Sequence, residues 1–240
     1  MSDPALFYTG LVAPLYTPLR SETPDAAPYI KFVERTGEPA LELGCGTGDP
    51  LLELRQHGLD VDGVDASGDM LDVCRARAAA LGLPVTLFEQ RMEALDLPRR
   101  YRSIYLAGPT FNLLPDDATA LAALQHVRSH LEEGGSALVP LHIPDAVDDK
   151  HLNRWREDTD DDGQRIRFCN VAQSRDETAR TQTTRLRYER GEGDTVESVE
   201  RDFVLHWYTT EQFAGLATDA GLAVTRRIDF TESAFAFFLQ

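Results

Sequence analysis

The sequence predicts an α/β fold built on a doubly wound, mostly parallel sheet, with a small antiparallel β insertion before the last helix. Apolar strand-like segments alternate with helical segments between residues 38 and 135, the pattern typical of parallel sheets. A dense glycine turn over residues 44–48 follows the first of these strands. After Pro144, β-rich runs with short connections replace the alternation, which indicates antiparallel hairpins.

Residues 1–37 are expected to form an N-terminal flap and one helix. Prolines at positions 4, 14, 18 and 24 exclude a long helix in the flap. An amphipathic helix is predicted from Asp25 to Arg35, with Gly37 ending it. The large side chains that could pack together within the flap are Phe7, Tyr8, Leu11, Leu15 and Tyr16.

Residues 38–144 are expected to form the main part of the sheet and its first helices. The predicted strands are 39–43, 60–65, 85–88, 103–107 and 136–143. The predicted helices are 50–57, 68–81 and 116–131. In the second of these helices Met70, Leu71, Val73 and Cys74 are spaced to form one buried face.

Residues 145–208 are expected to form the antiparallel insertion, and residues 209–240 to complete the main sheet. An acidic, solvated loop is predicted over residues 145–162. Three β-rich runs follow, at 164–173, 178–190 and 196–208. A helix at 209–221 and strands at 222–230 and 234–239 then close the chain.

The composition excludes several classes of protein. A net charge of −16 argues against nucleic acid as a partner, because binding a phosphate backbone requires a basic surface. No apolar run approaches the roughly 18 residues that span a bilayer, and the N-terminus lacks the features of a signal peptide. The three separated cysteines suit a reduced, cytoplasmic protein, and no metal-ligand spacing is present.

The strongest motif is the segment Leu41-Glu42-Leu43-Gly44-Cys45-Gly46-Thr47-Gly48, at the predicted turn from the first strand to the first helix. Glycines there let a ligand approach the backbone closely. A dinucleotide fingerprint requires its third glycine one residue later, where Asp49 stands. Glu42 and Asp49 would repel a pyrophosphate, whereas they would attract a ligand with sulfonium and ammonium groups.

A second motif is Gly63-Val64-Asp65-Ala66-Ser67, at the end of the second predicted strand. A carboxylate at this position can accept hydrogen bonds from two ribose hydroxyls. An ordinary polar residue or a helix cap is the alternative interpretation of Asp65 taken alone. The glycine turn beside it favours the ligand-binding interpretation.

With these motifs, residues 38–143 and 209–240 resemble the class I, Rossmann-like S-adenosylmethionine-dependent methyltransferases. The resemblance implies a seven-stranded sheet with an antiparallel last strand, for which residues 234–239 are placed. It also implies that S-adenosylmethionine is bound and leaves as S-adenosylhomocysteine. The positions that it assigns to the methionine end are Glu42, Gly44, Cys45 and Gly46, with Asp65 on the ribose and Ala66 and Met70 beside the adenine.

The adenine site departs from the family pattern. The family often has an acidic residue after the third strand, and Arg91 stands at that position. Since arginine cannot accept a hydrogen bond, Gln90 or a backbone carbonyl is expected to take this role, with Met92 packing on the ring.

The resemblance also implies where the two substrates meet. The backbone of Ala107 and Gly108 is expected to contact the methionine amino group, and Phe111 and Asn112 to face the transferable methyl group. A plain strand-to-helix loop is the alternative. In the small-molecule branch of the family an N-terminal tyrosine segment caps the cofactor, a place that Tyr8 and Tyr16 match by position only.

The predicted reaction is an in-line displacement that transfers the methyl group to a small-molecule acceptor. A neutral amine or a thiolate needs no general base, but an alcohol or a phenol does. His142, near the end of the fifth strand, and His206 and Tyr208, near the end of the insertion, are the candidate catalytic residues. A structural role is the alternative, and a histidine in a strand is more often structural than catalytic.

Two other functions stay open. One is a protein that binds S-adenosylmethionine without transferring methyl, or that uses it for cyclisation or elimination. The other is a nicotinamide-dependent oxidoreductase, which the position of the third glycine disfavours. The insertion is expected either to shape the acceptor pocket or to mediate a dimer contact, so the protein is expected to be a monomer or a homodimer.

Overall fold

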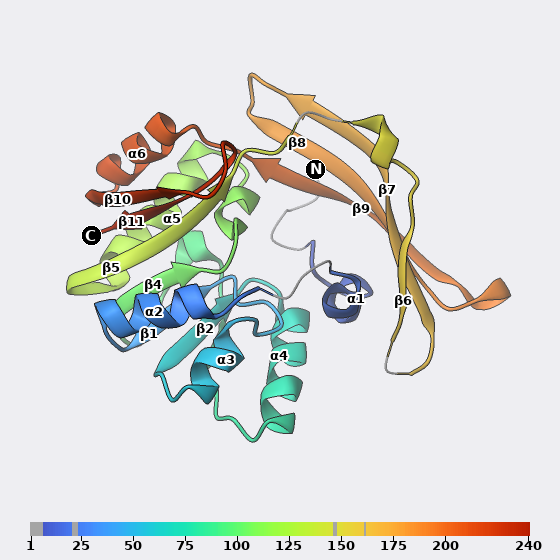
Figure 1. The fold of residues 1–240 in the computed structure, drawn as a ribbon, viewed down its shortest axis with the longest axis horizontal. Helices are drawn as coiled ribbons and strands as arrows, with labels where there is room; N and C mark the ends of the chain where they lie inside the picture. Colours follow the sequence, from blue (N-terminus) through green and yellow to red (C-terminus); the bar gives the residue numbers. More distant parts are fainter. Residues whose placement is uncertain (1–6, 21–23, 146–147, 161) are drawn as a thin grey trace.

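The computed structural model describes residues 7–20, 24–145, 148–160 and 162–240. Figure 1 shows a larger α/β layer and a smaller, curved antiparallel sheet, with helix α1 (Val12–Leu19) lying between them. Among the described residues, no helix has the length and apolar character needed to cross a bilayer.

The larger layer contains a seven-stranded sheet with the strand order β10-β11-β5-β4-β1-β2-β3. Its strands are β1 (Ala40–Leu43), β2 (Val61–Asp65), β3 (Leu87–Glu89), β4 (Tyr101–Leu106), β5 (Leu131–His142), β10 (Val224–Asp229) and β11 (Ala234–Leu239). Strands β1 to β5 pair in parallel, and β11 runs antiparallel to both β5 and β10. The predicted doubly wound sheet with an antiparallel last strand is therefore confirmed.

Helices cover both faces of this sheet. They are α2 (Ala27–Thr36), α3 (Leu51–Gln56), α4 (Gly68–Ala80), α5 (Asp117–His130) and α6 (Thr210–Asp219). Helices α2, α3 and α4 contribute to one buried apolar cluster, and α5 and α6 to another. Because apolar residues of the sheet strands contribute to both clusters, the sheet is buried on its two faces, as parallel sheets usually are.

Local sequence fixes where several helices begin. Ser67 is the N-cap of α4 and accepts a hydrogen bond from the Met70 amide at 3.2 Å. Asp116 caps α5 in the same way. Thr209 and Gln212 form a reciprocal capping box at the start of α6. Ser67 follows the last residue of β2 by two positions, so α4 begins directly after this strand.

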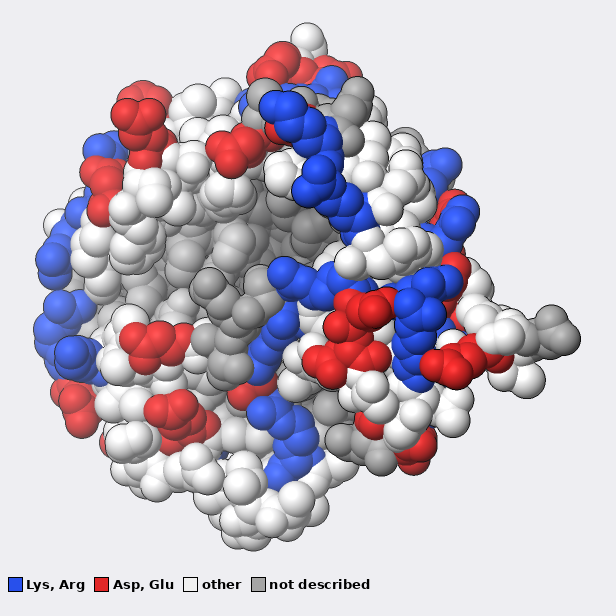
Figure 2. Space-filling view, turned by 45° about the vertical axis from the view of Figure 1, so that its right-hand side comes forward, with Lys and Arg blue, Asp and Glu red and all other residues white. Residues whose placement is uncertain are grey.

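The smaller sheet consists of β6 (Arg156–Thr159), β7 (Arg165–Asp176), β8 (Thr181–Arg190) and β9 (Glu197–His206), all antiparallel. In β8, Leu186 and Tyr188 are buried while Arg185 and Arg187 point outward. The outward arginines pair with Asp202 and Glu200 of β9. Figure 2 shows such basic and acidic side chains interleaved on this side of the molecule.

Two segments differ from the sequence prediction. Helix α1 forms within the proline-rich flap. Pro14 is compatible with this helix because it lies in the first turn, where backbone amides have no helical partner. Pro18 stands inside the helix near its end, and the helix stops at Leu19. Strand β6 lies within the predicted acidic loop; all four of its residues are exposed, so no apolar alternation marks it. The 3₁₀ helix Asp149–His151 lies in the same loop.

Candidate active site

A cavity of about 400 Å³ opens at the carboxyl edge of the large sheet, where open α/β sheets bind their ligands. Turns that follow β1, β2, β3 and β4 line it, and so do the flap and β9. Its residues are Tyr8, Tyr16, Arg20, Pro24, Gly44, Cys45, Gly46, Thr47, Asp49, Val64, Asp65, Ala66, Met70, Gln90, Arg91, Met92, Glu93, Ala107, Gly108, Pro109, Thr110, Leu113, Leu114, Pro115, Phe203 and Leu205.

The glycine turn forms one wall of this cavity. Gly44 and Gly46 have φ angles of 70° and 51°, in the left-handed region that residues other than glycine rarely adopt. The amides of Gly44 and Cys45 both donate to the Val64 carbonyl, at 2.7 and 3.0 Å, which ties the turn to the end of β2. The backbone of the turn is therefore presented to the cavity in a fixed shape.

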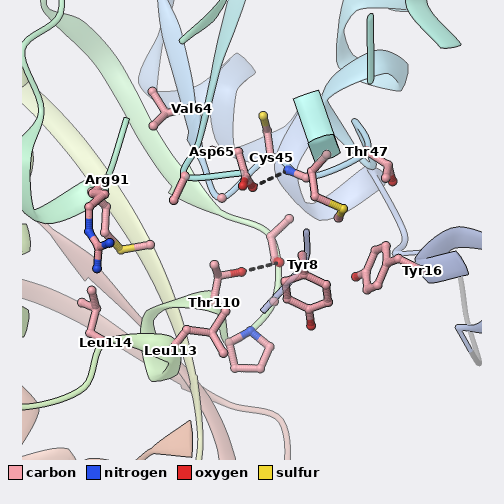
Figure 3. Close-up of a pocket in the computed structure, with 18 of the residues that line it drawn as sticks. Tyr8, Tyr16, Cys45, Thr47, Val64, Asp65, Arg91, Thr110, Leu113 and Leu114 are labelled. Carbon is pink, nitrogen blue, oxygen red and sulfur yellow. Dashed lines mark hydrogen bonds between the residues drawn. The ribbon is translucent and has the colours of Figure 1, made fainter. Parts of the chain in front are cut away.

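Asp65 lies at the end of β2, beside the glycine turn (Figure 3). Its two carboxylate oxygens accept hydrogen bonds of 2.8 Å from the amides of Gly46 and Ser67. Burial raises the pKa of Asp65, although these amide hydrogen bonds partly offset the effect. The carboxylate is thus oriented by backbone amides and lines the cavity, as its predicted role on a ribose requires.

Glu42 does not line the cavity, which corrects its predicted place. It is fully buried in β1, where its Oε2 accepts a 2.9 Å hydrogen bond from the Tyr105 hydroxyl. Burial raises the pKa of Glu42 well above the ordinary value, against the lowering effect of the Tyr105 hydrogen bond. Of the buried side-chain polar atoms that the structure describes, only Glu42 Oε1 lacks a hydrogen-bond partner.

Asp49, the other carboxylate of the motif, is paired with arginines. Arg77 donates to its two oxygens at 2.6 and 2.8 Å, and Arg20 of the flap lies 2.9 Å from Oδ2. Burial opposes ionisation here, but the two arginines outweigh it and lower the pKa of Asp49. The expected attraction between Asp49 and a cationic ligand is therefore largely compensated within the protein.

Of the predicted adenine residues, Arg91 follows β3 and lies on the opposite side of the cavity from Tyr8 and Tyr16 (Figure 3). Gln90, Arg91 and Met92 all line it, as do Ala66 and Met70. The Gln90 amide group is engaged with Asp96: its Oε1 accepts from the Asp96 amide at 2.8 Å, and its Nε2 donates to the Asp96 carbonyl at 2.9 Å. This engagement favours a backbone carbonyl as the acceptor for the adenine amino group.

Ala107 and Gly108, at the end of β4, also line the cavity, but Phe111 and Asn112 do not. Residues Thr110–Leu113 form a 3₁₀ helix, in which residues three apart share a face. Thr110 and Leu113 therefore both face the cavity, and the two residues between them point into the protein. The prediction that Phe111 and Asn112 face the methyl group is wrong for this reason.

Phe111 and Asn112 are instead part of the protein core. Phe111 is 1% exposed and packs against the rings of Tyr208 and Phe213, at centroid distances of 5.7 and 5.4 Å. Asn112 is fully buried and bonds to the main chain of His142 and His206.

The three candidate catalytic residues also lie outside the cavity lining. His206 and Tyr208 are buried and bonded to each other, with 2.9 Å between Nδ1 and the hydroxyl. Burial and the charge of Arg180 lower the pKa of His206, so this imidazole is neutral near pH 7. His142 is half-buried at the end of β5. The buried and mutually bonded pair of His206 and Tyr208 has the environment of structural residues.

The flap covers the cavity through Tyr8 and Tyr16, whose rings lie 5.1 Å apart in an edge-to-face arrangement (Figure 3). Short polar contacts hold the flap to the cofactor turns. The Ser67 hydroxyl donates to the Tyr8 carbonyl at 2.5 Å, and the Gly10 amide donates to Asp69 at 2.6 Å. Thr17 and Thr47 hydroxyls lie 3.0 Å apart.

Several lining residues were missed by sequence reasoning. Arg20 is bound to Asp49, and Thr110, Leu113 and Leu114 replace the two residues expected beside the methyl group. Phe203 and Leu205 of β9 line the cavity from the small sheet. Phe203 and Leu205 lie within residues 201–208 of the insertion, a run that matches the expected acceptor pocket by position only, whereas no sequence pattern indicates the pairing of Arg20.

The residues present fit S-adenosylmethionine. The cavity volume is within the range of small-ligand sites, and the Asp65 carboxylate that lines the cavity has no arginine or lysine partner among the described residues. A cationic nucleoside compensates such carboxylates, whereas a pyrophosphate does not. The turn at Gly44 and Gly46, Asp65, and the segment 90–92 would hold it.

The fold is that of the class I, Rossmann-like S-adenosylmethionine-dependent methyltransferases. Residues 40–135 match the model of the family described as "Methyltransferase domain", and this range contains the glycine turn, Asp65 and the end of β4.

Known proteins resemble the chain beyond this domain. A protein of Geobacillus sp. (strain WCH70) named as a methyltransferase is 24% identical over 81% of this chain and 78% of its own. The cypemycin N-terminal methyltransferase of Streptomyces sp is 28% identical over 60% of this chain and 59% of its own. The solved structure of the CcbJ methyltransferase from Streptomyces caelestis shares the fold, with a TM-score of 0.76, 23% identity and 95% of each chain covered.

Proposed function

We propose that this methyltransferase acts on a small-molecule amine, whose nitrogen attacks the methyl group as a neutral nucleophile. The observation that carries the proposal is the absence of a free general base from the described cavity lining. A neutral amine has an available lone pair, whereas an alcohol or a phenol must first lose a proton.

The carboxylates of the lining are all engaged. Asp65 is held by the amides of Gly46 and Ser67, and Asp49 by two arginines. Glu93 lies 2.6 Å from the Arg91 guanidinium. No histidine stands among the described residues that line the cavity. The described lining therefore has no unpaired carboxylate or histidine that could remove the proton of an alcohol.

The two tyrosines of the flap do not supply such a base. Burial raises the pKa of both Tyr8 and Tyr16, in Tyr16 against the lowering effect of Arg20. Their hydroxyls are therefore protonated at neutral pH and can accept or donate hydrogen bonds at the acceptor. Protonated tyrosine hydroxyls of this kind can orient an amine by hydrogen bonding to it.

The remaining contributions of the chain are orientation and exclusion of water. S-adenosylmethionine, when bound, supplies a methyl group that its sulfonium already activates. Asp65 and the glycine turn would fix the nucleoside, and the flap would cover the reacting atoms. Holding the nucleophile close to the methyl group and in line with the leaving sulfur supplies most of the rate enhancement. The similar cypemycin enzyme is named for transfer to an N-terminus, which supports a nitrogen acceptor.

The test uses S-adenosylmethionine with a labelled methyl group and four matched acceptors, a primary amine, a phenol, a carboxylic acid and a thiol. We expect label in the amine product, with stoichiometric S-adenosylhomocysteine. Label in the phenol, with a rate that falls when His142 is changed to alanine, would contradict the proposal. Loss of the cofactor without a methylated product would favour cyclisation or elimination, and competitive binding of a nicotinamide dinucleotide would favour an oxidoreductase.

We further propose a cytoplasmic location and a monomeric or homodimeric state without a nucleic-acid partner. The buried, unpaired Cys45, Cys74 and Cys169 suit a reducing compartment, and the net charge of −16 disfavours nucleic acid. Separation of the protein by size with light scattering tests the oligomeric part.

A further inference from the structure

A second cavity, of about 130 Å³, lies between the flap and the inner face of the small sheet. We call it the aromatic chamber. Its residues are Phe7, Tyr8, Tyr16, Leu19, Arg20, Phe168, Leu186, Tyr188 and Phe203. Six of these nine residues are aromatic, so its wall differs in chemistry from the polar turns around the cofactor cavity.

The aromatic rings that line the chamber pack against one another. Phe7 meets Phe203 edge to face at 5.0 Å and Tyr188 at 6.2 Å, and Phe168 stacks on Tyr188 at 5.4 Å. Such contacts fix ring orientations and leave edges and faces available to another ring. Leu186, which is 8% exposed, completes the wall from β8.

The chamber adjoins the cofactor cavity. Tyr8, Tyr16, Arg20 and Phe203 line both spaces. Arg20, the one charged residue of the shared wall, is directed to Asp49 at 2.9 Å. The two cavities therefore share a wall, and an acceptor that reaches both must pass between these side chains.

We infer that the aromatic chamber binds the non-reacting end of the acceptor, and that this end is an apolar six-membered ring, an aromatic one above all. Its volume is close to the roughly 150 Å³ of an engineered apolar cavity that binds benzene. Its wall offers ring edges and faces but few polar groups. The inference rests on the proposed transfer to an amine and names the class of amine, one in which a short linker joins the nitrogen to a ring.

The first arm of the test measures binding alone, with toluene as the probe and S-adenosylhomocysteine present. Saturation-transfer NMR is expected to show toluene bound to the wild type. Leu186→Trp fills the chamber and is expected to abolish that signal. Arg185→Trp introduces the same side chain on the outer face of β8, where Arg185 is exposed, and is expected to leave binding unchanged. No toluene signal in the wild type, or an equal signal in Leu186→Trp of unchanged melting temperature, would overturn the inference.

The second arm measures kcat/KM for benzylamine and for ethylamine at alkaline pH. We expect a preference for benzylamine of about 10-fold or more, lost in Leu186→Trp and kept in Arg185→Trp. If both amines are methylated equally by the wild type, the chamber inference fails and the proposed function stands. If neither amine is methylated although toluene binds in the chamber, the result contradicts the proposed transfer to amines. The chamber would then still be a site that binds an apolar ring.

Discussion

The side-chain amide of Asn112 donates a 2.8 Å hydrogen bond to the carbonyl oxygen of His206, which lies 94 residues further along the chain. The same amide nitrogen donates to the His142 carbonyl at 3.0 Å, and the His142 amide donates back to Asn112 Oδ1 at 3.0 Å. Strand β5 ends at His142 and β9 ends at His206. One buried side chain thus ties the end of β5 in the large sheet to the end of β9 in the small sheet.

Asn112→Ala is expected to lower the free energy of unfolding by about 2–4 kcal/mol, since it leaves buried main-chain groups without partners. Because Asn112 lies between the cavity residues Thr110 and Leu113, KM for the acceptor should rise more than the dissociation constant of S-adenosylhomocysteine. Denaturant titration and steady-state kinetics measure the two effects.

Asn170→Ala is the control for this variant. Asn170 is a half-buried asparagine of β7 whose side chain makes no hydrogen bond among the described residues, and its replacement is expected to cost much less. Equal losses of stability in the two variants would contradict the role given to Asn112.

Tyr208→Phe tests whether the pair formed with His206 is structural. The variant removes the hydroxyl that lies 2.9 Å from His206 Nδ1, so a loss of about 1–2 kcal/mol in stability is expected. The pH profile of kcat should keep its shape, because neither side chain lines the cavity. A profile that loses one limb in this variant would restore the pair as acid–base catalysts.

Asp65→Asn is expected to weaken the binding of S-adenosylhomocysteine by about 10- to 100-fold, because a charged acceptor is replaced by a neutral one at the proposed ribose site. Calorimetric titration measures the change. Asp72→Asn, on an exposed position of α4, is the matched control and should bind as the wild type does. An unchanged dissociation constant in Asp65→Asn would exclude the carboxylate from the site.

The affinity for S-adenosylhomocysteine should depend on pH through Asp65. Burial raises the pKa of this carboxyl, so it becomes protonated at a higher pH than an ordinary aspartate. The ionised form is the one that accepts two ribose hydrogen bonds, and ligand binding therefore lowers this pKa and releases protons in the acid range. Affinity should fall as the pH is lowered through the raised pKa, and Asp65→Asn should flatten that dependence. Calorimetry in buffers of different ionisation enthalpy counts the protons released.

Much of the fold could be predicted because its signals are local. Alternating strands and helices, the glycine turn before α3 and Ser67 at the start of α4 lie in short stretches of sequence. The position of Asp65 at the end of β2 follows from the length of that strand. In each case the residue and the structure that it determines are close together along the chain.

The errors arose where the outcome depends on contacts between distant segments. Phe111 and Asn112 have the right place in the chain, but the 3₁₀ turn directs them into the core. One partner of Asn112 lies in β9, and one partner of Asp49, Arg20, lies in the flap. Strand β6 is formed by pairing with β7 rather than by its own apolar pattern. Sequence spacing alone contains none of this information.

The most direct test of the central claim is a crystal structure of the protein with S-adenosylhomocysteine. We expect the nucleoside in the cavity between the glycine turn and the flap, its ribose hydroxyls on the Asp65 carboxylate and its adenine beside Met70 and Met92. A nucleoside bound elsewhere, or a ribose held without Asp65, would contradict the account.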